Sequence, residues 1–209
     1  MRVEYKLLNQ NSLEDVERLL TKDFAEHELM SKTLCIPPQE LQKVFAPLIK
    51  ASVKNSYIAK DKTLDKIIGS IICNDFSFFL NFSVSQNLCF ELQAIMELLT
   101  LLEQRFIKEY PELSKENASL YLYAVHVDAT YTRKGIGANL YKIVEEEARK
   151  QGFKNIVSIS TGPVSQHISL HKRGFEKIDE IPYQSFQFKG KSIFSALKNQ
   201  ACMMMIKPL

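Results

Sequence analysis

The sequence lacks any long apolar run. No stretch approaches the ~18 consecutive apolar residues that mark a membrane-spanning helix. We also expect no secretory leader, because Arg2, Glu4 and Lys6 interrupt the first residues before an apolar segment can form. We therefore expect a soluble, unexported protein of the cytoplasm that does not act at a membrane.

Paired cysteines and a strong charge of one sign are missing as well. The four cysteines have no Cys-x-x-Cys pair and no histidine at metal-ligand spacing: Cys35, Cys73, Cys89 and Cys202. Their distribution predicts reduced, mostly buried thiols and no metal site. The formal net charge of +3 is too small to indicate a nucleic-acid partner by itself.

The chain does have enough apolar residues for a sizeable core. Of its 209 residues, 45% are hydrophobic and 24% are charged, which is typical of a folded globular protein. We expect a single domain over residues 1–209, present as a monomer or a homodimer.

A basic glycine loop is the most informative segment. Residues 127–138 read Val-Asp-Ala-Thr-Tyr-Thr-Arg-Lys-Gly-Ile-Gly-Ala and join a strand pattern at 121–127 to a helical pattern at 139–150. Glycines let the backbone approach a ligand, and the free N–H groups and positive dipole end of a helix favour an anion. Arg133 and Lys134 add full charges there. The loop therefore predicts a pyrophosphate at this helix N-terminus.

Other glycine loops fit less well. A P-loop requires Gly-x-x-x-x-Gly-Lys-Ser/Thr, and a dinucleotide-binding turn requires a third glycine where this chain has Leu140. A turn that only starts a helix stays open as the plain alternative, because short motifs produce false positives.

The second half has the order strand, helix, strand. Gln151-Gly152-Phe153 is a helix stop, and residues 155–160 predict the next strand, as in a right-handed parallel crossover. A short helix at 165–173 then runs into Gly174-Phe175, and residues 201–206 predict the last strand.

The first half predicts a strand, two helices and a hairpin. The strand covers residues 2–8, the first helix begins after Ser12 as N-cap, and the second, at 39–51, follows Pro37-Pro38. Residues 57–60 and 66–74 predict the β-hairpin.

An insert at residues 75–117 contains an aromatic stretch, 76–82, and a helix, 89–109. The polar face of this helix is acidic and would repel anionic lipid, so core packing is favoured over a membrane-surface helix. Phe78 and Phe79 are expected to line an apolar substrate pocket. Tyr183, in an irregular stretch, is expected to close over the acceptor.

The loop is similar to the acyl-CoA-binding signature of the Gcn5-related N-acetyltransferases. That signature is Arg/Gln-x-x-Gly-x-Gly/Ala, and this chain has Thr132 at its first position. Residues 172–175, Lys-Arg-Gly-Phe, resemble the family's Lys/Arg-x-Gly-Phe sequence. The resemblance implies an α/β (α+β) fold with a mixed central sheet splayed at the acyl-CoA site, helices on both faces and a helical insert before the signature strand.

Within that superfamily the chain resembles the insect-type arylalkylamine N-acetyltransferases, through Val127-Asp128, Tyr131 and Gly135-Ile136. The resemblance implies acetyl transfer from acetyl-CoA directly to a small primary arylalkylamine or alkylamine. A peptide amine as acceptor, or a catalytically weak acyl-CoA-binding module, stay open. The residues expected to contact acyl-CoA are Val125, His126, Val127, Arg133, Lys134, Gly135, Ile136, Gly137 and Ala138.

The chemistry requires a base, because an alkylammonium has a pKa of roughly 10. The resemblance places Glu28 on the family's catalytic glutamate, and a register slip of two residues would place Glu26 there. A carboxylate can take the proton through a water, and an amide N–H near Val127 can stabilise the oxyanion. An exposed carboxylate at the end of an amphipathic helix is the plain alternative.

No general acid is assigned. The tyrosine that many acetyltransferases use corresponds here to Leu170, and serines proposed in the arylalkylamine group correspond to Gly162 and Gln166. Ser160, Thr161 and Ser165 lie beside them and are the alternatives, although hydroxyls at a helix start are more often caps. A CoA thiolate, with a pKa of about 8.5, can leave with little help.

Two histidines lie near these positions. His27 stands between the two candidate glutamates and is a possible member of a proton relay, since histidine titrates near neutrality. His126 alternates with Val125 and Val127 and is therefore expected on the opposite face of the sheet. A surface or hydrogen-bonded role is the commoner one for both.

Overall fold

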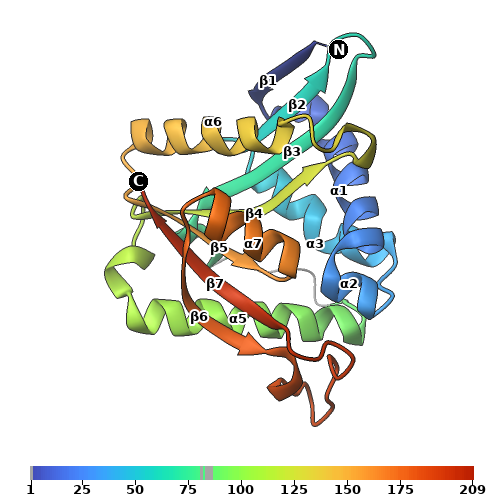
Figure 1. Cartoon of the computed structure of the whole chain (residues 1–209), viewed down its shortest axis with the longest axis vertical. Coiled ribbons are helices and arrows are strands. Elements are labelled where there is room, and N and C mark those ends of the chain that lie inside the picture. Colours follow the sequence, from blue (N-terminus) through green and yellow to red (C-terminus); the bar gives the residue numbers. More distant parts are fainter. Residues whose placement is uncertain (1, 81, 83–86) are drawn as a thin grey trace.

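The computed structural model describes residues 2–80, 82 and 87–209, without the side chain of Phe79. One mixed sheet has the strand order β1-β2-β3-β4-β5-β7-β6 (Figure 1). Its strands are β1 (Val3–Leu7), β2 (Tyr57–Asp61), β3 (Lys66–Asp75), β4 (Ser119–Val127), β5 (Asn155–Ser160), β6 (Glu176–Pro182) and β7 (Ala201–Pro208). β4 and β5 are parallel, and their neighbours in the order pair antiparallel.

The helices cover both faces of this sheet, as the sequence predicted (Figure 1). They are α1 (Leu13–His27), α2 (Leu29–Thr33), α3 (Pro38–Ala51), α4 (Phe76–Phe79), α5 (Phe90–Glu109), α6 (Ile136–Gln151) and α7 (Pro163–Lys172). No helix among the described residues combines the length and the apolar character that crossing a membrane requires.

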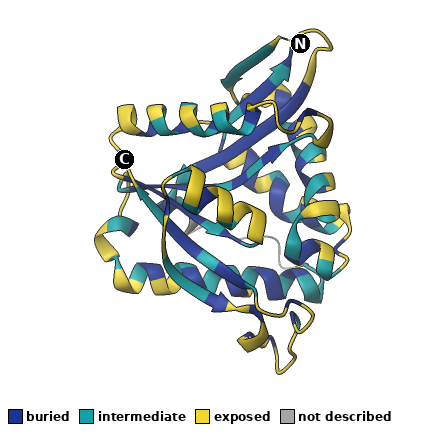
Figure 2. Ribbon diagram, viewed as in Figure 1, coloured by how far each residue is buried: buried dark blue, intermediate teal, exposed yellow. Residues whose placement is uncertain are grey.

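Two apolar cores lie on opposite faces of the sheet. On one face α1, α3 and α5 pack against residues such as Ile58, Ile72 and Val157. On the other face α6 packs against residues such as Ile71 and Ile156. Figure 2 shows the strands buried between these helical layers. Because successive side chains of a strand point to opposite faces, each strand contributes residues to both cores.

Some helix and strand boundaries differ from those predicted. α7 begins at Pro163 instead of residue 165, because proline is favoured in the first turn of a helix. α1 and α2 are separate because Glu28 has extended backbone angles, φ −69° and ψ 133°. β6 was not predicted: it is an edge strand of mostly charged residues, a common way to protect a sheet edge.

The insert contains the predicted helix, as α5, but its aromatic stretch is not a plain pocket wall. Phe76 is fully buried in the core, where its ring centroid lies 5.0 Å from Phe106 and 5.3 Å from Tyr121. Phe78 instead packs against Phe82, with centroids 5.3 Å apart. Residues 81 and 83–86 of the insert lie outside the described part of the chain.

Candidate active site

A gap between β4 and β5 forms the centre of the site. Parallel pairing of the two strands ends at Leu122 and Ser158, although β4 continues to Val127 and β5 to Ser160. At this point the Ser158 hydroxyl donates to the Leu122 carbonyl, 2.9 Å away. The splayed sheet expected from the resemblance is therefore present.

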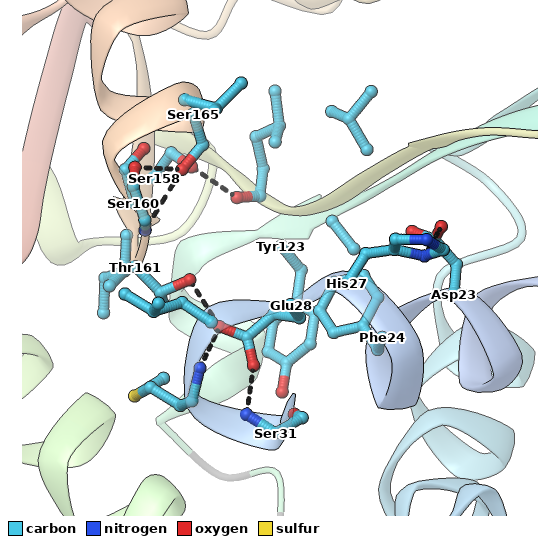
Figure 3. A pocket seen from close by; sticks show the side chains of 18 of the residues that line it. Asp23, Phe24, His27, Glu28, Ser31, Tyr123, Ser158, Ser160, Thr161 and Ser165 are labelled. Atoms are coloured by element: carbon cyan, nitrogen blue, oxygen red, sulfur yellow. Dashed lines mark hydrogen bonds and ion pairs between the residues drawn. The ribbon is translucent and has the colours of Figure 1, made fainter. Parts of the chain in front are cut away.

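A β-bulge lies on β4 where the strands part. Ile72 of β3 pairs with Ala124 and Cys73 pairs with Leu122, so Tyr123 is the extra residue of the bulge. Bulges bend a strand and redirect its side chains. Tyr123 is thereby directed into the cavity beside Glu28 (Figure 3).

Beyond the bulge, β4 offers backbone groups to the gap. The Asp128 N–H donates to the Ile68 carbonyl of β3 at 2.9 Å. Because successive amides of a strand face opposite sides, the amides of Val125 and Val127 face away from β3. Both residues line the cavity. They can therefore pair with an extended ligand as a further strand would.

The basic loop leads from β4 to the start of α6. Asp128 begins it: burial alone would raise the pKa of this carboxyl, but hydrogen bonds from Lys66 and Thr130 outweigh burial and lower it to about 2. The ion pair with Lys66 has a length of 2.7 Å. The loop is thus tied to β3 by a carboxylate that is ionised at physiological pH.

The loop bends through two left-handed residues before the helix. Arg133 has φ 61° and Gly135, the N-cap of α6, has φ 75°. The first intrahelical bond runs from the Asn139 N–H to the Gly135 carbonyl, 3.0 Å. The amides at residues 136–138 precede it and have no intrahelical acceptor, which suits a phosphate.

The side chains of the predicted loop residues lie at different places. Gly137 and Ala138 line the cavity. Ile136, the first residue of α6, has a buried side chain and can contribute only its amide. Arg133 is exposed. The Lys134 ammonium lies 4.8 Å from the ring centroid of Tyr131, outside the cavity lining.

The cavity itself passes through the gap from one face of the sheet to the other. It has a volume of about 640 Å³. On the α6 face its walls include Gly137, Ala138 and Tyr141, and on the opposite face they come from α1, α3 and α5. The described lining on that second face is mainly apolar: Phe24, Met30, Leu41, Val44, Phe45, Leu92, Ile95, Met96 and Leu99.

Glu28 lies at the cavity between α1 and α2. Its Oε1 accepts hydrogen bonds from the Met30 N–H at 3.1 Å and from the Thr161 hydroxyl at 2.7 Å, and its Oε2 accepts from the Ser31 N–H at 2.7 Å (Figure 3). The carboxylate therefore caps α2 and joins it to the end of β5. Of the four lone-pair positions of a carboxylate, one is left for a ligand or a water.

Glu26 is located differently. It is an exposed residue of α1 and is not among the residues that line the cavity. Of the two candidate glutamates, the structure brings only Glu28 to the gap.

The hydroxyl residues at the end of β5 are held in place by hydrogen bonds. Ser160 lines the cavity, is buried, and has its Oγ 3.5 Å from the Oγ of Ser169. The Thr161 hydroxyl points to Glu28. Ser165 accepts from the Gly162 N–H and donates to the Gly162 carbonyl, so it caps α7, the plain role considered for it.

Tyr183 is buried next to the end of β5. Its side chain is fully buried, it is absent from the cavity lining, and its hydroxyl donates to the Thr161 carbonyl at 2.6 Å. Phe78 is likewise not a lining residue. Both residues thus lie outside the described cavity lining, and their contact with a substrate stays a prediction. The side chain of Phe79 is outside the described part.

Two lining residues were not anticipated because they come together only through tertiary packing. Tyr141 of α6 and Arg173 after α7 stack, with the guanidinium 5.0 Å from the ring centroid. Burial raises the pKa of Tyr141 to about 12. The Arg173 Nε is buried and has no hydrogen-bond partner among the described residues.

Two polar residues of α1 line the cavity, and a third, on β4, lies next to them. Asp23 and His27 both line it, and the His27 Nδ1 lies 3.0 Å from the Asp23 Oδ1. The other carboxylate oxygen lies 2.8 Å from the Nδ1 of His126, which faces α1 from β4. The sequence did not single out Asp23, although its position four residues before His27 places both on one face of a helix.

Comparison with known proteins agrees with this geometry. The sequence matches the family described as "Acetyltransferase (GNAT) family" over residues 16–175. The C-terminal condensation domain of Ebony, solved with beta-alanyl-dopamine, superposes with a TM-score of 0.85 at 16% identity, each chain covered over 100%. Mosquito arylalkylamine N-acetyltransferase like 5b gives 0.79 at 20% identity, also over 100% of each chain.

A polyamine N-acetyltransferase of Drosophila melanogaster, which forms N-acetylagmatine, has the same fold, with a TM-score of 0.76 at 13% identity over 100% of each chain. At such identities these likenesses establish the fold, while the family match covers most of the sequence. The chain belongs to the GNAT family of N-acetyltransferases.

Proposed function

We propose that the protein transfers an acetyl group from acetyl-CoA directly to a small primary amine with an aromatic or aliphatic body. The observation that carries the proposal is the cavity that crosses the sheet. It joins the amide-rich start of α6 to an apolar chamber that contains Glu28. A phosphorylated donor and an apolar amine would therefore meet in the gap between β4 and β5.

The donor end suits the pyrophosphate and pantetheine of acetyl-CoA. Amides at residues 136–138 and the positive end of the α6 dipole would hold the pyrophosphate, with Arg133 and Lys134 adding charge. Val125 and Val127 would pair with pantetheine through their outward amides, one of which would also stabilise the oxyanion. His126, expected with them, faces α1 and is not proposed as a contact.

The acceptor end suits an ammonium attached to an apolar group. Asp23 and Glu28 are the carboxylates in the described lining, and the rest of that chamber is mainly hydrocarbon. We propose that the free lone pair of Glu28 attracts the ammonium and begins its deprotonation through a water. Burial of each additional CH₂ contributes about 0.8 kcal/mol, a factor of roughly four.

The test is a steady-state assay of CoA release with a panel of amines. Phenethylamine and n-alkylamines are expected to react, and kcat/KM should rise about four-fold per CH₂ until the chamber is full. A peptide with a free N-terminus and a polyamine serve as the competing acceptors. A preference for the peptide would overturn the proposed acceptor, and acetyl-CoA binding without turnover would identify a binding module.

A further inference from the structure

We propose that His27 receives the proton that the amine releases in each turnover, and that Asp23 positions its imidazole for this task. The inference rests on the proposed amine acetylation and extends it beyond Glu28. Transfer of an acyl group to an ammonium releases one proton net, and that proton must reach solvent.

The nitrogen lone pair forms the new C–N bond, and the C–S bond breaks with its electrons going to sulfur. The ammonium loses two protons in all: one neutralises the CoA thiolate and one is released. No atom changes its oxidation state, so the reaction requires a path for a proton and no further reactant.

Glu28 is well placed to attract the ammonium but less suited to keep its proton. Three of its four lone-pair positions already accept hydrogen bonds, from Met30, Ser31 and Thr161. An ordinary carboxyl is also a much weaker base than an amine, by roughly six pKa units, whereas an imidazole is weaker by roughly four. A histidine next to Glu28 is therefore the better final acceptor.

His27 is the histidine in the described lining of the cavity. It is adjacent to Glu28 in the chain, lines the same cavity, and lies beside Asp23 in the close view of the site (Figure 3). The contact of Nδ1 with Asp23 Oδ1, 3.0 Å, favours the tautomer that has its proton on Nδ1 and leaves Nε2 as the acceptor. Its side chain is 57% exposed, so a proton on Nε2 can pass directly to solvent.

Asp23 also lies close to His126 of β4. Its second oxygen lies 2.8 Å from Nδ1 of His126, whose side chain is 3% exposed, although this close contact is not aligned as a hydrogen bond. The charged and titratable groups around His27 are thus Asp23 on α1, Glu28 at the helix junction, His126 on β4 and, in the same cavity lining, Arg173. Asp23 is the positioning residue in this arrangement.

The experiment measures kcat and kcat/KM against pH for wild type, His27→Gln, Asp23→Asn and the double variant, with an amine that wild type acetylates. We expect His27→Gln to lower kcat roughly 100-fold at neutral pH, which is within the range for loss of a proton acceptor. Its rate should then continue to rise with pH toward the pKa of the amine, where free amine no longer requires the relay. Asp23→Asn should have a smaller effect, and the double variant should be no slower than His27→Gln.

Two controls separate a relay from a structural role. His171→Gln changes an exposed histidine of α7 outside the cavity and should leave the pH profile unchanged. Adding imidazole should restore much of the rate of His27→Ala, which a defect in folding would not permit. If wild type turns over and the pH profile of His27→Gln matches that of wild type, the relay is overturned while the proposed function stands. The same holds if imidazole does not restore the rate of His27→Ala. Absence of turnover in wild type would overturn the proposed function itself.

Discussion

Replacement of Glu28 separates its proposed catalytic role from its structural one. Glu28→Ala removes three hydrogen bonds, two to the amides at the start of α2 and one from Thr161. Loss of an N-cap costs about 1 kcal/mol of stability, and loss of one further hydrogen bond costs about 1 kcal/mol. We therefore expect the free energy of unfolding to fall by about 2 kcal/mol.

Glu28→Ser is the informative companion, because serine is a good N-cap but has no carboxylate. It should recover about 1 kcal/mol of that stability, yet it cannot attract the ammonium or begin to deprotonate it. Both variants should therefore lose roughly 10²-fold in kcat/KM for the amine, with the deficit largest at low pH. The KM for acetyl-CoA should stay near that of wild type, since the proposed donor site lies at the start of α6.

The assay combines CoA release with unfolding in urea, and Glu26→Gln is the matched control on an exposed residue of the same helix. A Glu28→Ser enzyme with kcat/KM within a few-fold of wild type would refute a catalytic role for Glu28. If Glu26→Gln showed the larger loss, the base would be the other glutamate.

Three further outcomes follow from the structure. Burial raises the pKa of Glu103 from 4.5 to about 7, so the folded state binds this proton more tightly and stability is lost as pH rises between those values. The loss in the free energy of unfolding is at most about 3 kcal/mol. Urea unfolding at pH 5 and pH 8 should show this difference in wild type and not in Glu103→Gln. A variant with the pH dependence of wild type would contradict this. Gly135→Ala places a side chain at φ 75° and costs about 1–2 kcal/mol in the loop, so titration should show weaker acetyl-CoA binding with the amine KM unchanged. Leu99→Trp reduces the acceptor chamber and should lower kcat/KM for long amines by roughly ten-fold or more while short amines react as before.

The elements around the donor site were predictable because their signals are local. The glycine loop, the helix that follows it and the strand at 155–160 are each encoded by adjacent residues, and the structure has them at nearly the predicted positions. The splayed strands came from the family resemblance, and the end of pairing at Leu122 and Ser158 agrees with it.

The acceptor side was harder to predict because it is built by tertiary packing. Phe78 and Tyr183 are of the residue type that often lines apolar pockets. Phe78 nevertheless packs on Phe82, and Tyr183 is buried with its hydroxyl bonded to the Thr161 carbonyl. Arg173 meets Tyr141 only because the fold brings the residue after α7 close to α6. The interaction of Asp23 with His27 was visible as an i, i+4 spacing, but its contact with His126 depends on how α1 packs on β4.

The most direct test is the identification of products when wild-type protein is incubated with acetyl-CoA and phenethylamine. The cavity that joins the α6 terminus to the apolar chamber predicts N-acetylphenethylamine and CoA in equal amounts, detected by mass spectrometry, with the Glu28→Ser protein nearly inactive. Acetyl-CoA that binds but transfers no acetyl group to phenethylamine or to any other amine of the panel would contradict it.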